Sequence, residues 1–500
     1  MPRFIEGEDR TQATLFPERL DDFIAEDNAV RLVEAFVDGL DLKALGFKRV
    51  EPRATGHPAY HASTLLKIYI YGYLKRLNSS RRLEGECRRN VEMMWLTCRL
   101  APDHKTICAF RKEHSKALGG VCREFVGVCR RLGLFKQALV AIDGSKFKAV
   151  NHRDKNFTKK KMKTRQERTA RHIARYLAEL DEADRSERGV PEAKTQDLKE
   201  KVKALQEEMV RLKAWDEQLQ AQPDGQLSLT DADSRSMKSN GRGSGVVGYN
   251  VQTAVEPDHH LIVAHEVINI GTDRHQLYPM AQRARAAMEV EKLSVVADRG
   301  YYSGPELRDC EEVGITTYVS KTDTSGKRKK GMYTKADFIY EPEHDRYRCP
   351  AGEHLIHRHR TFEHGMTIHV YWVSDPICRA CALRAKCTSS RQSRRIRRWE
   401  HEEVLDTIEA RLERAPEMMQ LRRQTVEHPF GTLKAWMGAT HFLTKTLPRV
   451  RAEMSLQVLA YNMKRVINLI GMRALIAAVR AMTSQVRRSL AIWASLIKTC

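Results

Sequence analysis

The chain has 500 residues, a formal net charge of +22 and 42% hydrophobic residues. This length exceeds one ordinary core and indicates two to four domains, and the hydrophobic content excludes a disordered protein. The excess of lysine and arginine favours a polyanionic partner, because each cation that neutralises a phosphate releases condensed counterions. Nucleic acid is therefore favoured over the alternative that the protein is merely basic and soluble.

The sequence shows no signal for export or membrane insertion. Residues 1–20 mix acidic and basic side chains, and charges interrupt the apolar region 456–497 too often for a span of about 18 uncharged residues. Eleven cysteines without an export signal favour reduced thiols, and metal binding is a better expectation for them than disulfides. We expect a cytoplasmic protein without a membrane partner.

Residues 1–135 are expected to form a helical DNA-binding domain. Asp103 is placed to cap a basic helix over 104–113, which is predicted to direct Lys105 and Arg111 outward, toward DNA. A helix, a turn and a capped basic helix are typical of a helix-turn-helix that reads the major groove. An ordinary small helical bundle remains an equal alternative.

A basic helical insertion is predicted over 151–233. It begins with a cluster of cations that includes Lys159, Lys160 and Lys161, for which DNA contact is slightly favoured over a solvated charged face. Leucines and related residues from Leu198 to Leu219 then recur at alternating four-three spacing, which indicates a coiled-coil seam. The seam either closes an antiparallel helical hairpin or joins two copies of the chain.

The segments 136–150 and 234–321 have the pattern of one α/β core. Strands are predicted at 138–142, 146–150, 248–255, 261–268, 293–297 and 316–319, with helices at 275–288, capped by Thr272-Asp273, and at 305–312. Residues 322–400 are basic and irregular, and 401–500 are mainly helical. The fold class is therefore α/β, with an N-terminal helical domain and two insertions.

Three acids are candidates for one catalytic site. Asp143 and Asp298 each follow a short apolar strand, and strand ends open into the crevice where sheet enzymes bind ligands. Glu427 shares a helical face with Arg423 and Lys434, because offsets of four and seven return to the same side. A pair of hard Mg²⁺ ions held by carboxylates activates a water or a 3′-hydroxyl in phosphodiester chemistry. Each acid alone has an ordinary alternative, such as a turn or an exposed ion pair, and Pro429 is expected to kink the helix.

These residues lie in segments that resemble the bacterial insertion-sequence transposases of the DDE class. The matching segments are 141–145, 297–301, 423–431, the N-terminal region 57–114 and the closing 462–465. Related transposases carry a Tyr-x2-Arg-x3-Glu-x6-Lys signature; Arg423, Glu427 and Lys434 match it, while Gln420 replaces the tyrosine.

The resemblance implies an RNase-H-like mixed sheet flanked by helices. It implies that Asp143, Asp298 and Glu427 are catalytic ligands of two Mg²⁺ or Mn²⁺ ions, and that the cations of the signature contact DNA. It also implies an enzyme that binds the terminal inverted repeats of its own element, cleaves there and joins the 3′-hydroxyl ends to target DNA. Coordinated cutting of two ends predicts a homo-oligomer, at least a dimer. A DNA-binding regulator without catalysis and a nuclease without strand joining are the alternatives.

A second candidate metal site lies in the insertion 322–400. Cys349, Cys378, Cys381 and Cys387 form the pattern C…C-x2-C-x5-C, which suits a tetrahedral structural Zn²⁺. Nearby histidines at 354, 357 and 359 are alternative ligands. Reduced cysteines without a metal are an equal alternative.

Overall fold

In the computed structural model, the described residues are 19–52, 58–185, 191–237, 245–321, 326 and 328–483. The chain forms two compact units. The first comprises residues 1–136, 144–272 and 426–500, and the second comprises 137–143 and 273–425. Strand β1 (Leu139–Lys148) and helix α14 (Glu417–Gly431) each contribute residues to both units.

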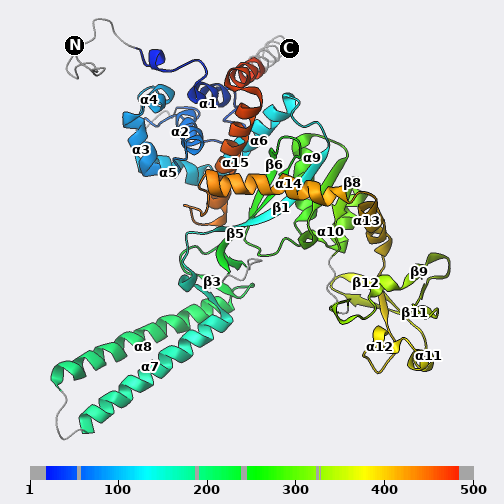
Figure 1. The fold of residues 1–500 in the computed structure, drawn as a ribbon. Helices are drawn as coiled ribbons and strands as arrows, with labels where there is room; N and C mark the ends of the chain where they lie inside the picture. The colour runs from blue at the N-terminus through cyan, green and yellow to red at the C-terminus, as the bar shows by residue number, and fades with distance from the viewer. Residues whose placement is uncertain are drawn as a thin grey trace, which may run out of the picture. The chain divides into compact units, whose positions relative to one another are not determined.

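The first unit opens with a bundle of short helices (Figure 1). Asp103 caps α5 as predicted, because its carboxylate accepts hydrogen bonds from the amides of Lys105 and Thr106. An additional helix, α4, lies between α3 and α5, so the predicted simple helix-turn-helix is a three-helix arrangement. The helices are α1 (Ala29–Asp38), α2 (Ala62–Leu74), α3 (Ser80–Arg89), α4 (Val91–Thr97), α5 (His104–Glu113) and α6 (Ser115–Arg131).

The outward orientation predicted for Arg111 is wrong. Its side chain is buried, donates a hydrogen bond from Nη1 to the Tyr73 hydroxyl at 2.8 Å, and stacks on the ring of Tyr69. Cys108, on the same helix, is exposed. The helix is therefore rotated relative to the prediction, and Lys105 remains as an exposed cation on α5 while Arg111 does not.

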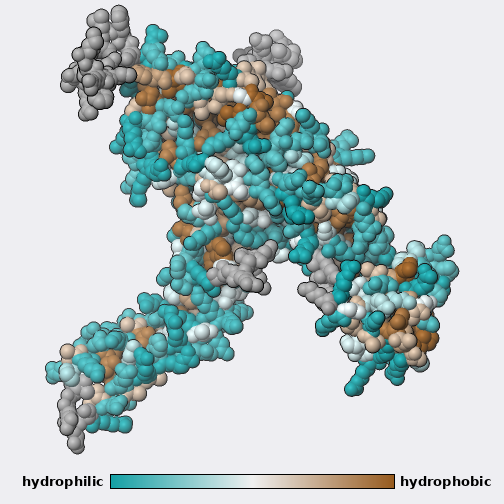
Figure 2. Space-filling view, in the orientation of Figure 1, coloured by the Kyte–Doolittle hydropathy of each residue, from teal (hydrophilic) through white to brown (hydrophobic). Residues whose placement is uncertain are grey.

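The predicted helical hairpin is present. Helices α7 (Lys159–Arg185) and α8 (Glu192–Gln220) run side by side and antiparallel, and they extend from the short pair β2 (Asn156–Thr158) and β3 (Gln226–Ser228) (Figure 1). Leu198, Val202, Leu212 and Leu219 are buried along α8. The seam thus closes on its own hairpin, while the outer surface of the hairpin is mainly hydrophilic (Figure 2).

The first unit also holds β4 (Arg235–Met237), β5 (Val246–Val255) and β6 (Ile262–Ile268), with the order β4-β5-β1 and with β6 antiparallel to β5. Helix α15 (Leu447–Ile470) packs against β6 and supplies much of the buried core. The side-chain amide of Asn462 accepts a hydrogen bond from the Ile262 amide at 3.0 Å and donates one to its carbonyl at 2.9 Å. This pairing ties the helix to the strand by two otherwise unsatisfied backbone groups.

In the second unit, β1, β7 (Leu293–Ala297) and β8 (Ile315–Val319) form parallel pairs in that order. Helix α10 (Gly304–Glu312) connects β7 to β8, and α9 (Leu277–Met288) precedes β7. The predicted cap at Thr272-Asp273 is wrong, since α9 begins after Gln276. The predicted pair of strands at 138–142 and 146–150 is one continuous strand, β1.

The sequence analysis predicted that residues 322–400 are irregular, but the described part of this segment is regular. It holds a five-stranded antiparallel sheet in the order β13-β12-β11-β10-β9, with two short helices, α11 (Asp375–Ala380) and α12 (Arg384–Cys387). Helix α13 (Glu402–Arg414) follows. The strands are β9 (Ile339–Glu341), β10 (Arg346–Arg348), β11 (His354–Glu363), β12 (Met366–Trp372) and β13 (Ile396–Trp399).

Within the described ranges, no single helix has the length and apolar composition needed to cross a membrane. The helices 447–470 and 472–483 reach that length and apolar composition only when they are taken together, and a 112° bend separates them.

Candidate active site

Asp143 and Asp298 lie on neighbouring strands of the second unit. The parallel register pairs Ile142 with Ala297, so each aspartate follows directly on a paired residue. Neighbouring strands are about 4.8 Å apart, which brings the two backbones into adjacent positions. Asp298 follows the end of β7 as predicted, whereas Asp143 lies within β1 where its pairing with β7 stops. At Asp143, β1 loses this neighbour because β7 ends at Ala297, while β1 itself continues.

The turn after β7 fixes the Asp298 carboxylate. Oδ1 accepts a hydrogen bond from the Gly300 amide at 2.7 Å, which makes Asp298 the cap of a 3₁₀ turn over Arg299–Tyr301. A Cβ on residue 300 would lie 2.9 Å from that same oxygen. Glycine is therefore the residue that allows this turn without displacing the carboxylate.

Tyr301, the last residue of this turn, has a buried side chain. Its side chain is 1% exposed. Burial raises its pKa well above the usual range, and the negative charges of Asp273, Asp143 and Asp298 add to the effect. The phenol therefore stays neutral, and its surroundings show that several carboxylates concentrate negative charge at this end of the strands.

A cation already contacts Asp143. Arg422 on α14 donates a hydrogen bond from Nη1 to Asp143 Oδ2 at 3.2 Å, with side-chain exposures of 15% and 25%. The sequence singled out Arg423, but Arg423 is exposed on the next helical position, about 100° around the axis. The sequence analysis missed Arg422, because nothing in the sequence around it signals a contact with Asp143.

We expect the variant Arg422→Gln to bind Mn²⁺ more tightly than the wild type, by about fivefold, because a partly exposed cation beside Asp143 opposes a second cation by about 1 kcal/mol. Electron paramagnetic resonance of free Mn²⁺ in DNA-free protein measures this. Arg423→Gln, on the adjacent exposed position of the same helix, is the matched control and should leave binding unchanged. Equal or weaker Mn²⁺ binding by Arg422→Gln would refute the charge opposition.

Glu427 belongs to the first unit, in the last part of α14. Gln420, Arg423 and Glu427 are all exposed, as expected for positions that share one helical face. Thr425, Val426 and Phe430 of the same helix are buried. The helix thus presents the predicted third acid to solvent.

Lys434 does not continue that open face. α14 runs through Pro429 and changes into a π-helical segment over Thr432–Trp436, which alters the rotation per residue. The Lys434 ammonium instead donates to Ser145 Oγ at 2.6 Å and to the Lys146 carbonyl at 3.1 Å, and lies over the Phe147 ring. Burial lowers its pKa. The prediction that Lys434 shares a helical face with Glu427 assumed a regular α-helix, and the π-helical segment breaks that regularity.

The lysines at the start of α7 differ in their contacts: two are exposed and one is bound to backbone carbonyls. Lys159 and Lys160 are exposed. Lys161 donates from Nζ to the carbonyls of Arg153 and Asn156 at 2.7 and 2.9 Å, and lies over the Phe157 ring. The ammonium of Lys161 is thus already engaged in holding the loop before the helix.

The oxygen donors at the strand ends suit a hard divalent cation, which prefers carboxylates and retains waters. Arg422 beside Asp143 shows that the site favours positive charge. Among the described residues, no three His, Cys, Asp or Glu side chains are already arranged as one metal's ligands. The two aspartates therefore supply part of a ligand set rather than a closed cage.

Two family models match the chain. Residues 18–113 match a transposase domain (DUF772), and residues 222–463 match a transposase DDE domain. The second match includes Asp298 and Glu427. The chain belongs to the DDE transposase family.

The transposase is therefore an enzyme of a family that cleaves DNA and transfers strands, with DNA as its partner and divalent metal ions as the family's cofactors. A solved structure of the piggyBac transposase synaptic complex with hairpin DNA matches 93% of this chain and 79% of that chain, at 8% identity and a TM-score of 0.28. This likeness is too low to support an argument about the site. A search of curated proteins finds no match to the chain.

Proposed function

We propose that the transposase mobilises its own insertion sequence, with Asp143, Asp298 and Glu427 as the ligands of two Mg²⁺ or Mn²⁺ ions. It binds the terminal inverted repeats, cleaves there and joins the freed 3′-hydroxyl ends to target DNA. The observation that carries the proposal is the Ile142–Ala297 register, which puts two aspartates at adjacent strand positions. The metal ions would activate the attacking oxygen and stabilise the leaving oxygen.

The strand order supports an RNase-H-like domain. The order β6-β5-β1 in one unit and β1-β7-β8 in the other share β1, with an antiparallel hairpin followed by parallel strands joined through α9 and α10. In such a sheet the acids of β1 and β7 are neighbours, and a third acid arrives from a later helix. We assign that role to Glu427, since α14 is exposed at this position and Arg422 on the same helix reaches Asp143.

The residues of this chain divide the remaining work. Asp298, fixed by Gly300, and Asp143 would hold the metal ions, and Tyr301 would keep the turn after β7 packed through its buried side chain. Arg423 and Lys105 are exposed cations that would grip phosphates. Lys434 would hold the part of β1 that follows Asp143 in place through its hydrogen bond to Ser145, and would contribute less to DNA contact than the exposed cations.

DNA end processing tests the proposal. Purified transposase is incubated with labelled DNA from both flanks of its reading frame and with Mg²⁺. We expect metal-dependent nicks at the element ends and joined products with a target plasmid. Nicks without joined products would replace the proposal with a nuclease, and tight binding without nicks in Mg²⁺ or Mn²⁺ would replace it with a regulator.

The same preparation tests the proposed oligomer. We expect light scattering to show at least a dimer when paired ends are present, because each end needs its own active site. Only monomers in the presence of paired ends would contradict this. The buried seam of α8 is used within its own hairpin, so the contact between copies must lie elsewhere.

The exposed lysines at the start of α7 are expected to contact phosphates. The variant Lys159→Gln/Lys160→Gln should weaken binding to duplex DNA and reduce the slope of log K against log salt by about 0.9 per lost contact. Binding titrations over a range of salt measure this slope. The variant Glu167→Gln/Gln166→Ala, on the same helix, is the control and should not reduce it; an unchanged slope in the lysine variant would remove this part of the interface.

A further inference from the structure

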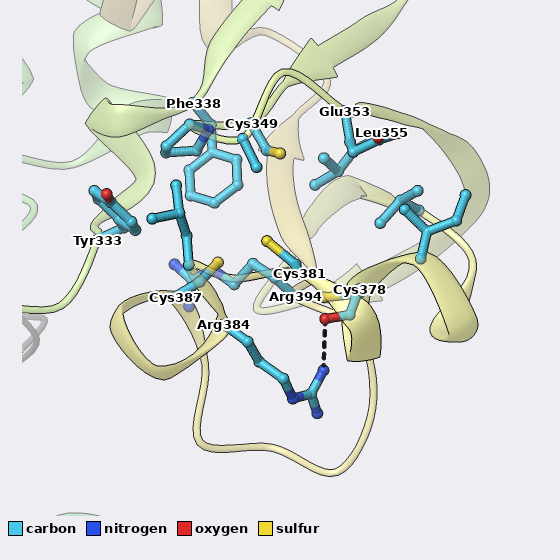
Figure 3. A pocket seen from close by; sticks show the side chains of 15 residues that line it. Tyr333, Phe338, Cys349, Glu353, Leu355, Cys378, Cys381, Arg384, Cys387 and Arg394 are labelled. Carbon is cyan, nitrogen blue, oxygen red and sulfur yellow. Dashed lines mark hydrogen bonds between the residues drawn. The ribbon is translucent and has the colours of Figure 1, made fainter.

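The four cysteines of the insertion, separated by up to 38 residues in sequence, meet at one cavity. Cys349, Cys378, Cys381 and Cys387 all line it, and its volume of about 30 Å³ is large enough for a single ion. Figure 3 shows the side chains of Cys349, Cys381 and Cys387 around the same space. The sequence alone left open whether these thiols come together.

The backbone at these cysteines is already shaped for ligation. The chain turns tightly after Cys349, where the Gly352 amide donates to the Cys349 carbonyl at 2.8 Å and Gly352 has φ +85°. A second turn follows Cys381, whose carbonyl accepts from the Arg384 amide at 3.1 Å. These hydrogen-bonded turns fix the backbone from which Cys349 and Cys381 line the cavity.

One buried cation beside the cavity suits a shell of anionic ligands. Arg384 and Arg394 both line the cavity, but the Arg384 guanidinium donates to backbone carbonyls, to that of Cys378 at 3.2 Å and that of Ser390 at 2.7 Å. Arg394 Nε is buried and has no hydrogen-bond partner within the described part of the chain. Four thiolates around Zn²⁺ carry a net charge of −2 and accept such N–H donors, which would satisfy this buried group.

The histidines that the sequence left as alternative ligands are engaged elsewhere. His357 packs against His369 and Tyr371, and His359 packs against Trp372. His354 lies beside Glu341. None of the described residues that line the cavity is a histidine.

The cysteines adjoin a hydrophobic cluster of the insertion. Cys349 and Cys387 pack against buried residues of this cluster, which comprises Phe338, Tyr347, Leu355, Tyr371 and Ile396. A metal that joins the two turns to α11 and α12 beside this cluster would add folding free energy directly.

We propose that Cys349, Cys378, Cys381 and Cys387 bind one structural Zn²⁺ as four thiolates, beside the buried Arg394. The sulfurs are not yet arranged as a ligand shell, so binding requires rotation of the cysteine side chains on their fixed turns. The site is separate from the DNA chemistry, and it stands whether or not the proposed function holds.

Metal content of the full-length chain tests the proposal. Purified from zinc-supplemented medium, the protein should contain about one Zn²⁺ per chain, released as a mercurial reagent modifies four thiols. Substitution with Co²⁺ should give thiolate-to-metal charge-transfer bands and the intense visible bands of a four-coordinate ion. Protein without zinc that also gives no such bands with Co²⁺ would overturn the proposal.

Variants locate the ion. Cys349→Ser and Cys387→Ser should each lose the zinc, whereas Cys98→Ser and Cys108→Ser, at exposed cysteines of the helical bundle, should keep it. His357→Ala should also keep it. Retention by both Cys349→Ser and Cys387→Ser would overturn the assignment; if these variants fail to fold, the Co²⁺ spectrum of the wild type still decides it.

Discussion

Asp143→Asn, Asp298→Asn and Glu427→Gln should each lower metal-dependent nicking of the element ends by about 1,000-fold, corresponding to about 4 kcal/mol of transition-state stabilisation. Each change keeps the shape of the side chain but removes a negative charge that a hard cation requires. Rates of nicking on labelled end DNA, at saturating protein, measure the effect. Binding to the same DNA should change far less, because phosphate contacts come from other residues.

Glu417→Gln is the matched control for these variants. Glu417 is an exposed acid at the start of the same helix α14 that carries Glu427, ten residues earlier. It should nick DNA at the wild-type rate. Wild-type nicking by Glu427→Gln would remove Glu427 from the mechanism, and wild-type nicking by Asp143→Asn or Asp298→Asn would contradict the pairing of acids across β1 and β7.

Asn462→Ala should destabilise the first unit by about 3 kcal/mol. The substitution leaves the Ile262 amide and carbonyl without partners in a fully buried position, and each unsatisfied group costs about 1–3 kcal/mol. Hydrogen exchange should show faster exchange of the Ile262 amide and of the neighbouring amides of β6, and calorimetry should show a lower melting temperature.

Asn468→Ala separates this effect from helix propensity. Asn468 is exposed on the same helix α15, so its replacement gains the same propensity as Asn462→Ala without exposing a buried polar group. We expect an unchanged or slightly raised melting temperature. Equal destabilisation by both variants would show that the Asn462 pairing does not matter.

Local patterns predicted much of the fold. The apolar run before Asp298 is β7, the alternating spacing from Leu198 to Leu219 is the buried face of α8, and Asp103 caps α5. These succeed because each depends on neighbours in the sequence, such as a helical period or the first free amides of a helix.

Two predictions failed where tertiary pairing decided the structure. The apolar run 138–142 suggested that a strand ends before Asp143, but β1 continues to Lys148 and only its pairing with β7 stops at Ile142. Cations and histidines concealed the strands of residues 354–372, where the pairing of β11 with β12 overrides weak local preference.

The candidate site was predicted in part for the same reason. Asp143 and Asp298 could be singled out from their strands, and the register places them side by side. Arg422 could not, because its role depends on which turn of α14 faces Asp143. Arg111 looked like a surface cation in the sequence, yet Tyr73 and Tyr69 hold it in the core.

The convergence of the three acids on shared metal ions is most directly tested by iron-directed cleavage of the protein itself. Fe²⁺ is bound in place of Mg²⁺ in the complex with end DNA, and ascorbate with peroxide then cuts the backbone near the ion. We expect fragments that end close to residues 143, 298 and 427, all suppressed by excess Mg²⁺. Cuts near the two aspartates without any near Glu427, or cuts that Mg²⁺ does not suppress, would contradict a single three-carboxylate metal site.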